Sequence, residues 1–375
     1  MIEERVITTH KIILGNANNV EQIPDASVDL MVTSPPYPMI EMWDEIFSKQ
    51  NPGIRQALED KNGKKAFELM HKELYRVWKE VYRTLRDGGF ACINVGDATR
   101  TIDDKFTLYT NGARILHSCL DLGFNVLPEI LWRKQTNAPN KFMGSGMLPA
   151  GAYVTLEHEH ILILRKGNKR KFASCDEKLR RQRSAFFWEE RNVWFSDVWE
   201  DLKGTKQNNI DKNIRERSGA YPFELPYRII NMYSLRGDMV LDPFLGTGTT
   251  TVAAIATGRN SVGIEIDPNF EDHFFLRCGD CVDFSNRLIE SRLANHLKFV
   301  AQRVASKGKL GYTSKNYGFP VMTNQEVEIT FDEIKQISTS GKELQVEYSD
   351  NPSYKYLDGF LQRGKSLKNW LSEKP

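Results

Sequence analysis

The chain has 375 residues, of which 40% are hydrophobic and 27% are charged, and its formal net charge at pH 7 is +2. These values are ordinary for a soluble globular protein with one large α/β domain plus an insert or a small second domain. No apolar run reaches the roughly 20 residues that a membrane-spanning helix needs. The first residues lack the basic-then-apolar pattern of a signal peptide. We therefore expect a cytoplasmic protein.

Apolar runs typical of buried strands alternate with amphipathic helical patterns, which predicts a doubly wound, mostly parallel α/β sheet. The predicted strands cover residues 11–14, 28–32, 90–95, 126–132, 160–164, 239–241 and 261–266. Predicted helices contain the apolar positions between 67 and 85, residues 108–122, a segment from 222, residues 249–257, and a segment from about 285 to 304. Gly88-Gly89 is expected to end the first of these helices as a C-cap pair. Strand-like runs at 327–331 and 344–348 lie in a C-terminal segment without a recognisable motif.

The loop Thr33-Ser34-Pro35-Pro36-Tyr37 directly follows a predicted strand, at the position where α/β sheets place ligands. An exocyclic amine on a base is a poor nucleophile, because its lone pair is delocalised into the ring. Ser34 Oγ and the Pro35 carbonyl can accept its two N–H groups, and Tyr37 offers a ring on which a flipped-out base can stack. The alternative interpretation is a rigid turn, since the two prolines stiffen the loop.

A second loop, Asp242 to Thr250 with the sequence DPFLGTGTT, lies between a predicted strand and a predicted helix. Gly246 and Gly248 permit a tight turn and a close approach of the backbone to a ligand. The loop is neither a dinucleotide fingerprint nor a phosphate-binding P-loop. Glu265 ends the next strand, where a carboxylate can accept hydrogen bonds from ribose hydroxyls. Its alternative role is to cap the following helix.

Basic residues are concentrated between positions 165 and 183, where nine Lys or Arg stand against two acidic residues, a local charge of +7. A second basic stretch covers residues 203–217. Periodicity is weak from about 133 to 216, which indicates an inserted recognition region. Between the two basic stretches lie six aromatic residues: Phe186, Phe187, Trp188, Trp194, Phe195 and Trp199. Basic residues interleaved with aromatic ones are typical of a nucleic-acid surface, and the alternative is a solvated loop over core aromatics.

The five cysteines are odd in number and scattered, which argues against a disulfide framework. Cys278 and Cys281 form a single CxxC, and a structural zinc site would need a second pair. We expect buried thiols and no metal.

From about residue 10 to 290 the motifs resemble the amino-methylating DNA methyltransferases that use S-adenosylmethionine. The order, with the Ser34 loop before the Gly246 loop, is that of the β class. The resemblance implies the Rossmann-like fold of S-adenosylmethionine-dependent methyltransferases and assigns catalysis to Ser34, Pro35, Pro36 and Tyr37. It assigns cofactor binding to Asn16, Thr33, Asp97, Pro222, Asp242, Phe244, Gly246, Gly248, Thr249, Thr250 and Glu265. It assigns DNA contact to Lys134, Arg165, Lys166, Lys169, Arg170, Lys171, Arg180, Arg181 and Arg183.

Two positions depart from the family pattern. Asn16 stands where the family has Asp, which keeps an acceptor oxygen but loses the charge. Arg217-Ser218 stands ahead of Pro222, where the family has His-Pro.

The resemblance divides the chain by function. Residues 1–134 are the predicted catalytic half, 135–216 the target-recognition insert, 217–290 the cofactor half, and 291–375 an extension of unknown role. Within the family, Ser at position 34 favours N4 of cytosine in duplex DNA, with N6 of adenine as the alternative. A restriction–modification role implies a cognate endonuclease, and the protein is expected to be a monomer or homodimer. Less favoured alternatives are methylation of another planar amide, such as a glutamine side chain, and a non-catalytic DNA-binding module.

Overall fold

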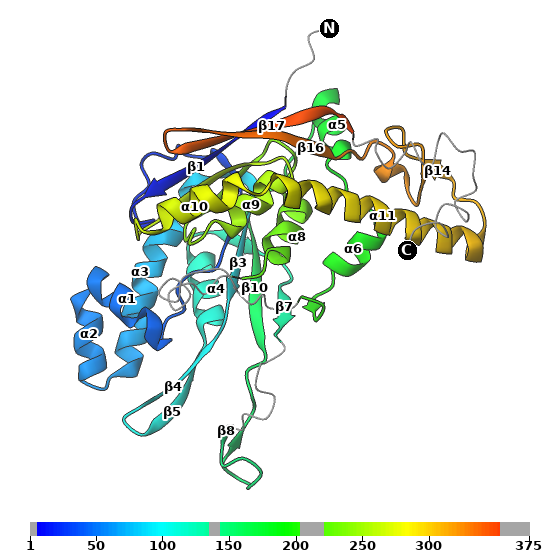
Figure 1. The fold of residues 1–375 in the computed structure, drawn as a ribbon. Helices are drawn as coiled ribbons and strands as arrows, with labels where there is room; N and C mark the ends of the chain where they lie inside the picture. The colour runs from blue at the N-terminus through cyan, green and yellow to red at the C-terminus, as the bar shows by residue number, and fades with distance from the viewer. Residues whose placement is uncertain (1–5, 135–142, 203–220, 353–375) are drawn as a thin grey trace. The chain divides into compact units, whose positions relative to one another are not determined.

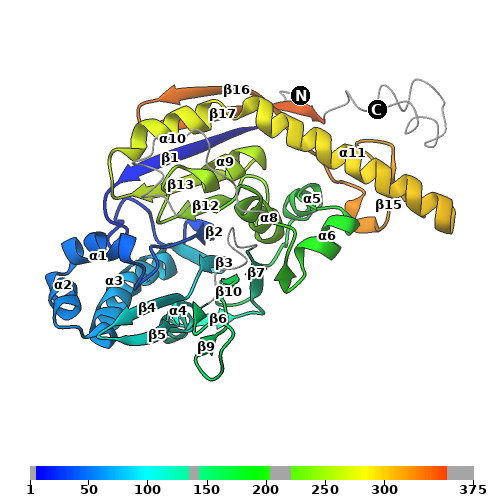
Figure 2. The same cartoon turned by 60° about the horizontal axis from the view of Figure 1, so that its bottom comes forward.

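The computed structural model describes residues 6–134, 143–202 and 221–352. The chain forms two compact units, whose elements are labelled in Figures 1 and 2. The Ser34 unit comprises residues 15–169 and 196–225, and the Gly246 unit comprises residues 1–14, 170–195 and 226–375. The predicted basic stretch 203–217 and the Arg217-Ser218 departure lie outside the described residues.

The Ser34 unit is built on a mixed sheet with the strand order β11-β7-β10-β3-β2, in which β6 also pairs with β10. Strands β2 and β3 run parallel, as do β11 and β7, whereas β10 is antiparallel to both β3 and β7. The bounds are β2 Val28–Thr33, β3 Leu85–Val95, β6 Phe124–Val126, β7 Ile130–Arg133, β10 His158–Lys166 and β11 Val198–Trp199. The run predicted as one strand over 126–132 is thus two strands, interrupted at residues 127–129.

Helices and two hairpins complete the Ser34 unit. Helix α3 packs against β3 through an apolar stripe that includes Met70, Leu74, Val77 and Val81, as the helical spacing predicts. Helix α4 packs against β6 and β10. The helices are η1 Glu41–Trp43, α1 Asp44–Gln50, α2 Pro52–Glu59, α3 Gly63–Thr84 and α4 Asn111–Asp121. The hairpins are β4 Ala98–Ile102 with β5 Lys105–Tyr109, and β8 Met143–Gly144 with β9 Ala152–Tyr153.

The predicted Gly88-Gly89 cap of α3 is wrong. The helix ends at Thr84, and Leu85 is already extended and pairs with Val28 of β2. Both glycines lie inside β3, at a shift in the β2–β3 register, where Gly88 has φ +82°. The neighbouring strand supplies hydrogen-bond partners as soon as the helix ends. The glycines therefore allow a local irregularity in β3 and do not cap the helix.

The Gly246 unit is built on strands in the order β12-β13-β1-β17-β16. The first three are parallel, and β17 is antiparallel to both β1 and β16. The strands are β1 Ile7–Leu14, β12 Met239–Asp242, β13 Asn260–Glu265, β16 Asp332–Ser340 and β17 Glu343–Pro352. Helix α9 packs against β1, β12 and β13, and α11 packs against β16. The helices are α5 Cys175–Arg183, α6 Trp188–Trp194, α8 Glu224–Tyr233, which begins just before the unit boundary, α9 Thr249–Ala256, α10 Phe270–Gly279 and α11 Val282–Lys307.

The described part of the C-terminal extension belongs to the core of the Gly246 unit. Strand β17 pairs with β1 over residues 343–347 and contains the predicted strand 344–348. The strand predicted over 327–331 is wrong, because these residues enter an apolar cluster with α11 and the strand begins only at Asp332. Three short elements complete the segment: β14 Tyr312–Thr313, β15 Pro320–Val321 and η2 Asn324–Glu326.

The predicted α/β class with a mostly parallel central sheet is confirmed, since β12, β13 and β1 run parallel in one unit and β2 and β3 in the other. Within the described ranges, no helix has both the length and the apolar character needed to cross a membrane. Four of the five thiols are buried as predicted, and Cys175 is exposed.

Candidate active site

The Ser34 loop begins where β2 ends. Thr33 pairs with Ile93 of β3 and is fully buried, so the next residue, Ser34, lies beside Asn94. Pro35 is buried, while Ser34 and Tyr37 are partly exposed. The Ser34 loop therefore combines a buried anchor with two partly exposed residues that carry hydroxyl groups.

A hydrogen-bonded cluster surrounds the two hydroxyls. Ser34 Oγ lies 3.0 Å from the Tyr37 hydroxyl, which donates to Glu159 Oε2 at 3.0 Å. Asn94 Nδ2 donates to Glu159 Oε2 at 2.6 Å and to the Tyr37 oxygen at 3.0 Å, and lies 3.4 Å from Ser34 Oγ. Lys134 forms an ion pair with the other oxygen of Glu159. We call these five residues the Ser34 cluster.

The Ser34 cluster is tightly packed. A Cβ atom on Gly96 would lie 3.0 Å from the Tyr37 ring and 3.3 Å from Glu159 Cγ, so only glycine fits there without a shift. Burial, and after it the Glu159 carboxylate, raises the pKa of Tyr37 well above its usual value. The phenol is therefore neutral in the working range of pH and available as a hydrogen-bond donor.

Sequence reasoning did not identify Glu159 or Asn94 as site residues. Asn94 is a polar residue within the apolar run at the end of β3, which is an available signal. Glu159 stands between two histidines ahead of the apolar part of β10, and the local sequence carries no such signal for it. Their proximity depends on the antiparallel pairing of β10 with β3, in which His160 faces Val95. That pairing brings the start of β10 to the end of β3.

Three further predicted cofactor residues of this unit have identifiable structural contacts. Asp97 Oδ1 accepts the backbone N–H of Gly112 at 3.0 Å at the start of α4. Asn16 Oδ1 accepts the N–H of Asn18 at 3.0 Å in the turn after β1. Pro222 is buried at the start of the turn that leads into α8. Contact of these residues and of Thr33 with the cofactor stays a prediction.

In the Gly246 unit, Asp242 organises the loop that follows β12. Its carboxylate accepts the hydroxyl of Thr250 at 2.5 Å and the backbone N–H of Phe244 at 3.1 Å. Both Asp242 and Thr250 are buried. One side chain thus ties the end of the strand to the first turn of α9.

The two glycines of the loop differ in what surrounds them. Gly246 has φ +53°, and no heavy atom lies within 4 Å of the position that a Cβ would take. Gly248 has φ +79° at the N-terminus of α9, and a Cβ there would lie 3.0 Å from Phe274. Gly246 therefore leaves open space beside the backbone for a ligand, whereas Gly248 allows close packing on α10.

Glu265 faces this loop from the end of β13. Its carboxylate accepts the N–H groups of Gly246 at 2.8 Å and Asp267 at 2.9 Å. Burial raises the pKa of Glu265, and the two N–H donors act in the opposite direction. Each carboxylate oxygen keeps a further acceptor site, so the group fits the ribose hydroxyls of a nucleoside cofactor. The glycine loop and the acidic strand end are joined by a direct hydrogen bond, while their predicted contact with a cofactor stays a prediction.

Arg277 is a loop contact that the sequence did not suggest. One of its nitrogens, Nη1, donates to Thr247 Oγ1 at 2.5 Å and to Thr249 Oγ1 at 2.9 Å. Arg277 lies in the last turn of α10, so the helix that packs on Gly248 also fixes the hydroxyls on either side of it.

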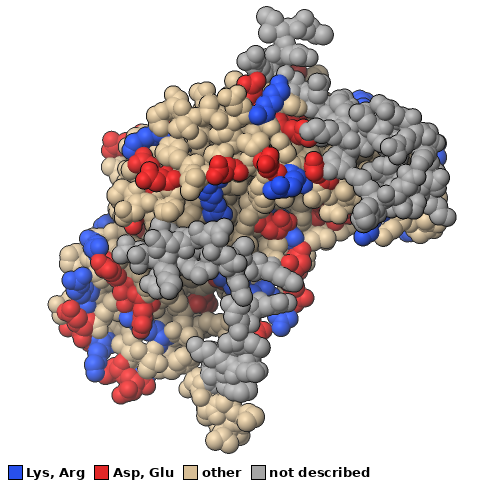
Figure 3. All heavy atoms as spheres, viewed as in Figure 1, with Lys and Arg blue, Asp and Glu red and all other residues tan. Residues whose placement is uncertain are grey.

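Many residues of the predicted DNA-contact set have partners within the fold. Arg170 and Arg180 both form ion pairs with buried Asp238, and Lys166 donates to two backbone carbonyls. Arg181 lies over the Phe172 ring. Lys134 belongs to the Ser34 cluster, Arg165 donates to the Gly167 carbonyl, and Lys169, Lys171 and Arg183 are exposed. On the face shown in Figure 3, Lys and Arg alternate with Asp and Glu over the described parts. DNA contact by this set stays a prediction.

The aromatic residues near the basic stretch pack largely into the fold. Phe187, Trp194 and Trp199 are buried, in agreement with the alternative interpretation for these rings. Phe195 is exposed, so the segment is not uniformly internal.

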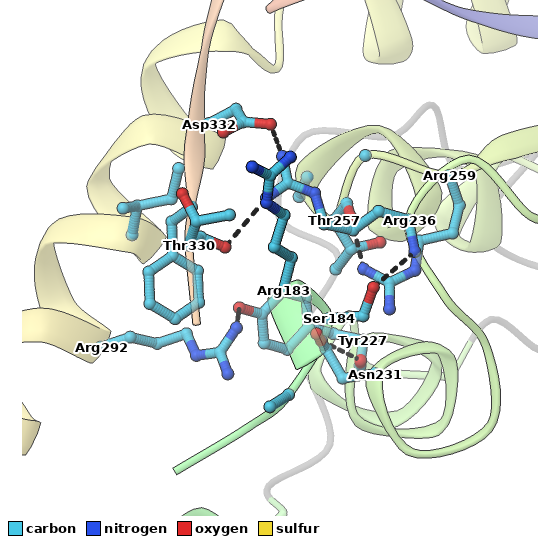
Figure 4. Close-up of a pocket in the computed structure, with 15 residues that line it drawn as sticks. Arg183, Ser184, Tyr227, Asn231, Arg236, Thr257, Arg259, Arg292, Thr330 and Asp332 are labelled. Carbon is cyan, nitrogen blue, oxygen red and sulfur yellow. Dashed lines mark hydrogen bonds and ion pairs between the residues drawn. The ribbon is translucent and has the colours of Figure 1, made fainter. Parts of the chain in front are cut away.

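A small pocket in the Gly246 unit is lined by four arginines and lies at the far end of α9 from the glycine loop (Figure 4). Three of their guanidinium groups are engaged. Arg236 pairs with Asp332, Arg292 pairs with Glu190 at 2.6 Å, and Arg259 donates to Ser234 and to the Thr257 carbonyl. These contacts make the pocket part of the packing between helices and the C-terminal segment. In the parts of the chain described, no group of three or more His, Cys, Asp or Glu could hold a metal ion.

A mostly parallel sheet with a glycine loop after one strand and a carboxylate at the end of the next defines a nucleoside-cofactor-binding α/β protein. The chain belongs to the N4/N6 amino-methyltransferase family, whose model, described as DNA methylase, matches residues 28–275. It is 52% identical over 323 residues to the Type II methyltransferase M.MthZI of Methanothermobacter thermautotrophicus, covering 86% of this chain and 90% of the relative. M.MjaI of Methanocaldococcus jannaschii is 50% identical over 282 residues, covering 72% of this chain and 91% of the relative.

Solved structures agree with this assignment. TTHA0409 of Thermus thermophilus, in complex with S-adenosyl-L-methionine, gives a TM-score of 0.56 at 30% identity and covers 72% of this chain and 93% of its own. PvuII DNA methyltransferase (cytosine-N4-specific) shares the fold, with a TM-score of 0.51 at 16% identity and coverage of 75% and 92%. The chain is therefore an S-adenosylmethionine-dependent DNA methyltransferase of the amino-methylating family.

Proposed function

We propose that the enzyme methylates the exocyclic N4 amine of a cytosine flipped out of duplex DNA, as the modification enzyme of a restriction–modification system. The observation that carries the proposal is the position of Ser34 and of its hydroxyl. Ser34 is a partly exposed residue that directly follows β2, and its hydroxyl oxygen lies 3.0 Å from the hydroxyl of Tyr37. A serine oxygen beside an aromatic ring suits a flat base that presents an amine.

The residues of the Ser34 unit act on the base. The amine needs acceptors for its N–H groups, so that its lone pair is turned toward the methyl donor. Ser34 Oγ and the Pro35 carbonyl fill this role, and the Tyr37 ring stacks on the base. The Tyr37 hydroxyl is anchored by Glu159, which leaves the ring as the part of the side chain that meets the base.

The Gly246 loop holds the cofactor, which supplies an activated methyl group. Glu265 accepts ribose hydroxyls, Gly246 gives the cofactor room beside the backbone, and Asp242 with Thr250 keeps the loop in shape. When bound, S-adenosylmethionine would supply its methyl carbon to the amine nitrogen with the sulfur as leaving group, and the proton lost by the amine would pass to water.

The exposed basic side chains of the predicted insert bind the DNA backbone. Five members of the predicted set between 165 and 183 are exposed: Lys169, Lys171, Arg180, Arg181 and Arg183. Arg180 pairs with Asp238 and Arg181 lies over the Phe172 ring, so Lys169, Lys171 and Arg183 best suit phosphate contact. Arg170 and Arg180 act indirectly, because their ion pairs with Asp238 fix the segment that carries the exposed residues.

The test is methyl transfer to duplex DNA from labelled S-adenosylmethionine, followed by digestion to nucleosides and mass spectrometry. N4-methylcytosine as the product supports the proposal, and N6-methyladenine replaces the cytosine assignment with the adenine one. Label in RNA or protein but in no duplex overturns DNA as the substrate. Resistance of the modified duplex to an endonuclease from the same organism tests the restriction–modification role.

Ser34→Ala separates catalysis from binding. We expect kcat to fall about 100-fold, the scale on which loss of one positioned hydrogen bond acts, with affinity for S-adenosylmethionine unchanged. Ser34→Thr keeps a hydroxyl and serves as the matched control. Full activity in Ser34→Ala contradicts the proposed role.

A further inference from the structure

We propose that Glu159 is a positioning residue that fixes the direction of two O–H bonds, so that Ser34 Oγ can only accept a hydrogen bond from the target amine. This inference rests on the proposed function and assigns Glu159, Asn94 and Lys134 a role in it. It follows from counting the hydrogens in the Ser34 cluster.

The Tyr37 hydroxyl has one hydrogen and two neighbouring oxygens that could take it. A carboxylate only accepts and forms stronger hydrogen bonds than a neutral hydroxyl. The hydrogen therefore goes to Glu159 Oε2, 3.0 Å away. The Tyr37 oxygen can then only accept, so the Ser34 hydrogen points toward Tyr37 across the 3.0 Å contact. Asn94 Nδ2 also lies 3.4 Å from Ser34 Oγ as a weak donor and uses at most one of its lone pairs, so the other lone pair is left for the N–H of a base.

Asn94 strengthens this arrangement. Its side chain is buried, and its amide nitrogen donates to Glu159 at 2.6 Å and to the Tyr37 oxygen at 3.0 Å. The reversed amide would place its oxygen against the carboxylate, which is repulsive. Asn94 thus supplies a second hydrogen to the Tyr37 oxygen, which strengthens the hydrogen bond that the phenol donates to Glu159 Oε2.

Lys134 pairs with the carboxylate of Glu159. Glu159 is only 7% exposed, and a buried carboxylate without a partner is costly. The ion pair with Lys134 engages Oε1 and leaves Oε2 for Tyr37 and Asn94. Three groups on β10, β3 and the segment after β7 therefore set the polarity of one serine hydroxyl.

We call the ordered pair of hydrogen bonds from Ser34 to Tyr37 and from Tyr37 to Glu159 the relay. Replacing Glu159 by Gln should reverse the direction of both hydrogen bonds. An amide nitrogen facing Tyr37 donates to the phenol oxygen, which frees the phenol hydrogen to turn toward Ser34. The Ser34 hydrogen then points at the target amine, so two donors meet. We expect kcat to fall about 10- to 100-fold, the effect of losing one hydrogen bond in a site of this kind. Dissociation constants for duplex DNA and S-adenosylmethionine should change by less than about threefold.

The deciding experiment combines Glu159→Gln with Tyr37→Phe, which keeps the stacking ring but removes the relay hydroxyl. We measure kcat on duplex DNA for the wild type, both single variants and the double variant. Glu159→Gln should lower kcat by about 10- to 100-fold when Tyr37 is present, and by less than about threefold when Tyr37 is replaced by Phe. An equal loss in both backgrounds overturns the relay, because a residue that merely supports the fold acts without the hydroxyl.

Two further measurements keep the outcome clear. Glu159→Asp keeps an acceptor-only group, so it should recover part of the activity lost in Glu159→Gln. Glu159→Asn, which also puts an amide in place of the carboxylate, takes the place of Glu159→Gln in the cycle if that variant does not fold. NMR of ¹³C-tyrosine-labelled protein, with Tyr37→Phe used for assignment, follows ionisation of Tyr37 whether or not the enzyme is active. Loss of the Glu159 charge should move that ionisation to lower pH, and no movement overturns the Glu159–Tyr37 contact.

The same data distinguish the relay from the proposed function. If the wild type methylates adenine instead of cytosine, the cytosine assignment fails and the cycle is interpreted as before, because both bases present an exocyclic amine. If the wild type methylates no duplex, the proposed function fails, and the NMR titration still tests the Glu159–Tyr37 contact on which the inference depends.

Discussion

The backbone N–H of Gly246 donates to Glu265 Oε2 at 2.8 Å, which joins the glycine loop after β12 to the end of β13. The same carboxylate accepts the N–H of Asp267. Glu265 therefore stabilises the glycine loop, and its carboxylate oxygens still have lone pairs that can accept hydrogen bonds from a ligand. The two strands that meet here are parallel neighbours, which places both ends at the same edge.

Glu265→Ala should weaken binding of S-adenosylmethionine about 10- to 100-fold, because hydrogen bonds to a charged group contribute about 1.5–3 kcal/mol. Isothermal titration calorimetry measures the change. Ser34→Ala, which alters a side chain outside this loop, is the control and should bind the cofactor as the wild type does. Unchanged affinity in Glu265→Ala would falsify the ribose role.

Thr250→Val should lower the free energy of unfolding by about 1–3 kcal/mol, since it leaves the buried Asp242 carboxylate without the hydroxyl donor at 2.5 Å. Urea unfolding followed by circular dichroism provides the measurement. Thr250→Ser keeps the donor and should stay within about 1 kcal/mol of the wild type. If the two variants are equally stable, the hydrogen bond does not hold the loop.

Acid should destabilise the fold through two buried histidines. Burial lowers the pKa of His10 and of His71 to about 3. Below the unfolded value of about 6.5, the unfolded chain binds protons that the folded chain does not, so stability falls as pH falls from 6.5 toward 3. Each histidine should contribute about 1.4 kcal/mol per pH unit in that range.

The variant His71→Gln tests this contribution. Urea unfolding at several pH values between 7 and 5 should show a smaller pH slope in His71→Gln than in the wild type, by close to one proton. His117→Gln, in which an exposed histidine is replaced, is the matched control. Identical slopes in His71→Gln and the wild type would contradict the low pKa.

Tyr348 tests whether the C-terminal segment supports the Gly246 unit. Its buried hydroxyl donates to the Ile255 carbonyl at 2.7 Å and lies 3.1 Å from Thr8 Oγ1. Tyr348→Phe should cost about 1–3 kcal/mol, and Tyr348→Ala should cost more because it also leaves a cavity. Thermal unfolding measures both, with Tyr312→Phe at an exposed position as the control. An effect no larger than that of the control would show that the contact is not stabilising.

Much of the fold could be predicted from local pattern. The buried strands before Ser34 and Asp242 are short apolar runs, and β2 is buried along its whole length. The helical stripe of α3 has the 3.6-residue period that packs one face on a sheet. The errors came where a neighbouring strand decided the outcome, as at Gly88, and where apolar residues entered a cluster, as at Val327.

The sequence by itself determined the two loops, their order and their place after buried strands, because residue type and spacing carry that information. Only the tertiary structure decided what surrounds them. The Tyr37–Glu159 hydrogen bond spans 122 residues and the Thr8–Tyr348 contact spans 340. Both depend on which strands pair and in which register. Strand pairing is a choice among distant segments that compete for the same backbone hydrogen bonds, and no local period encodes it.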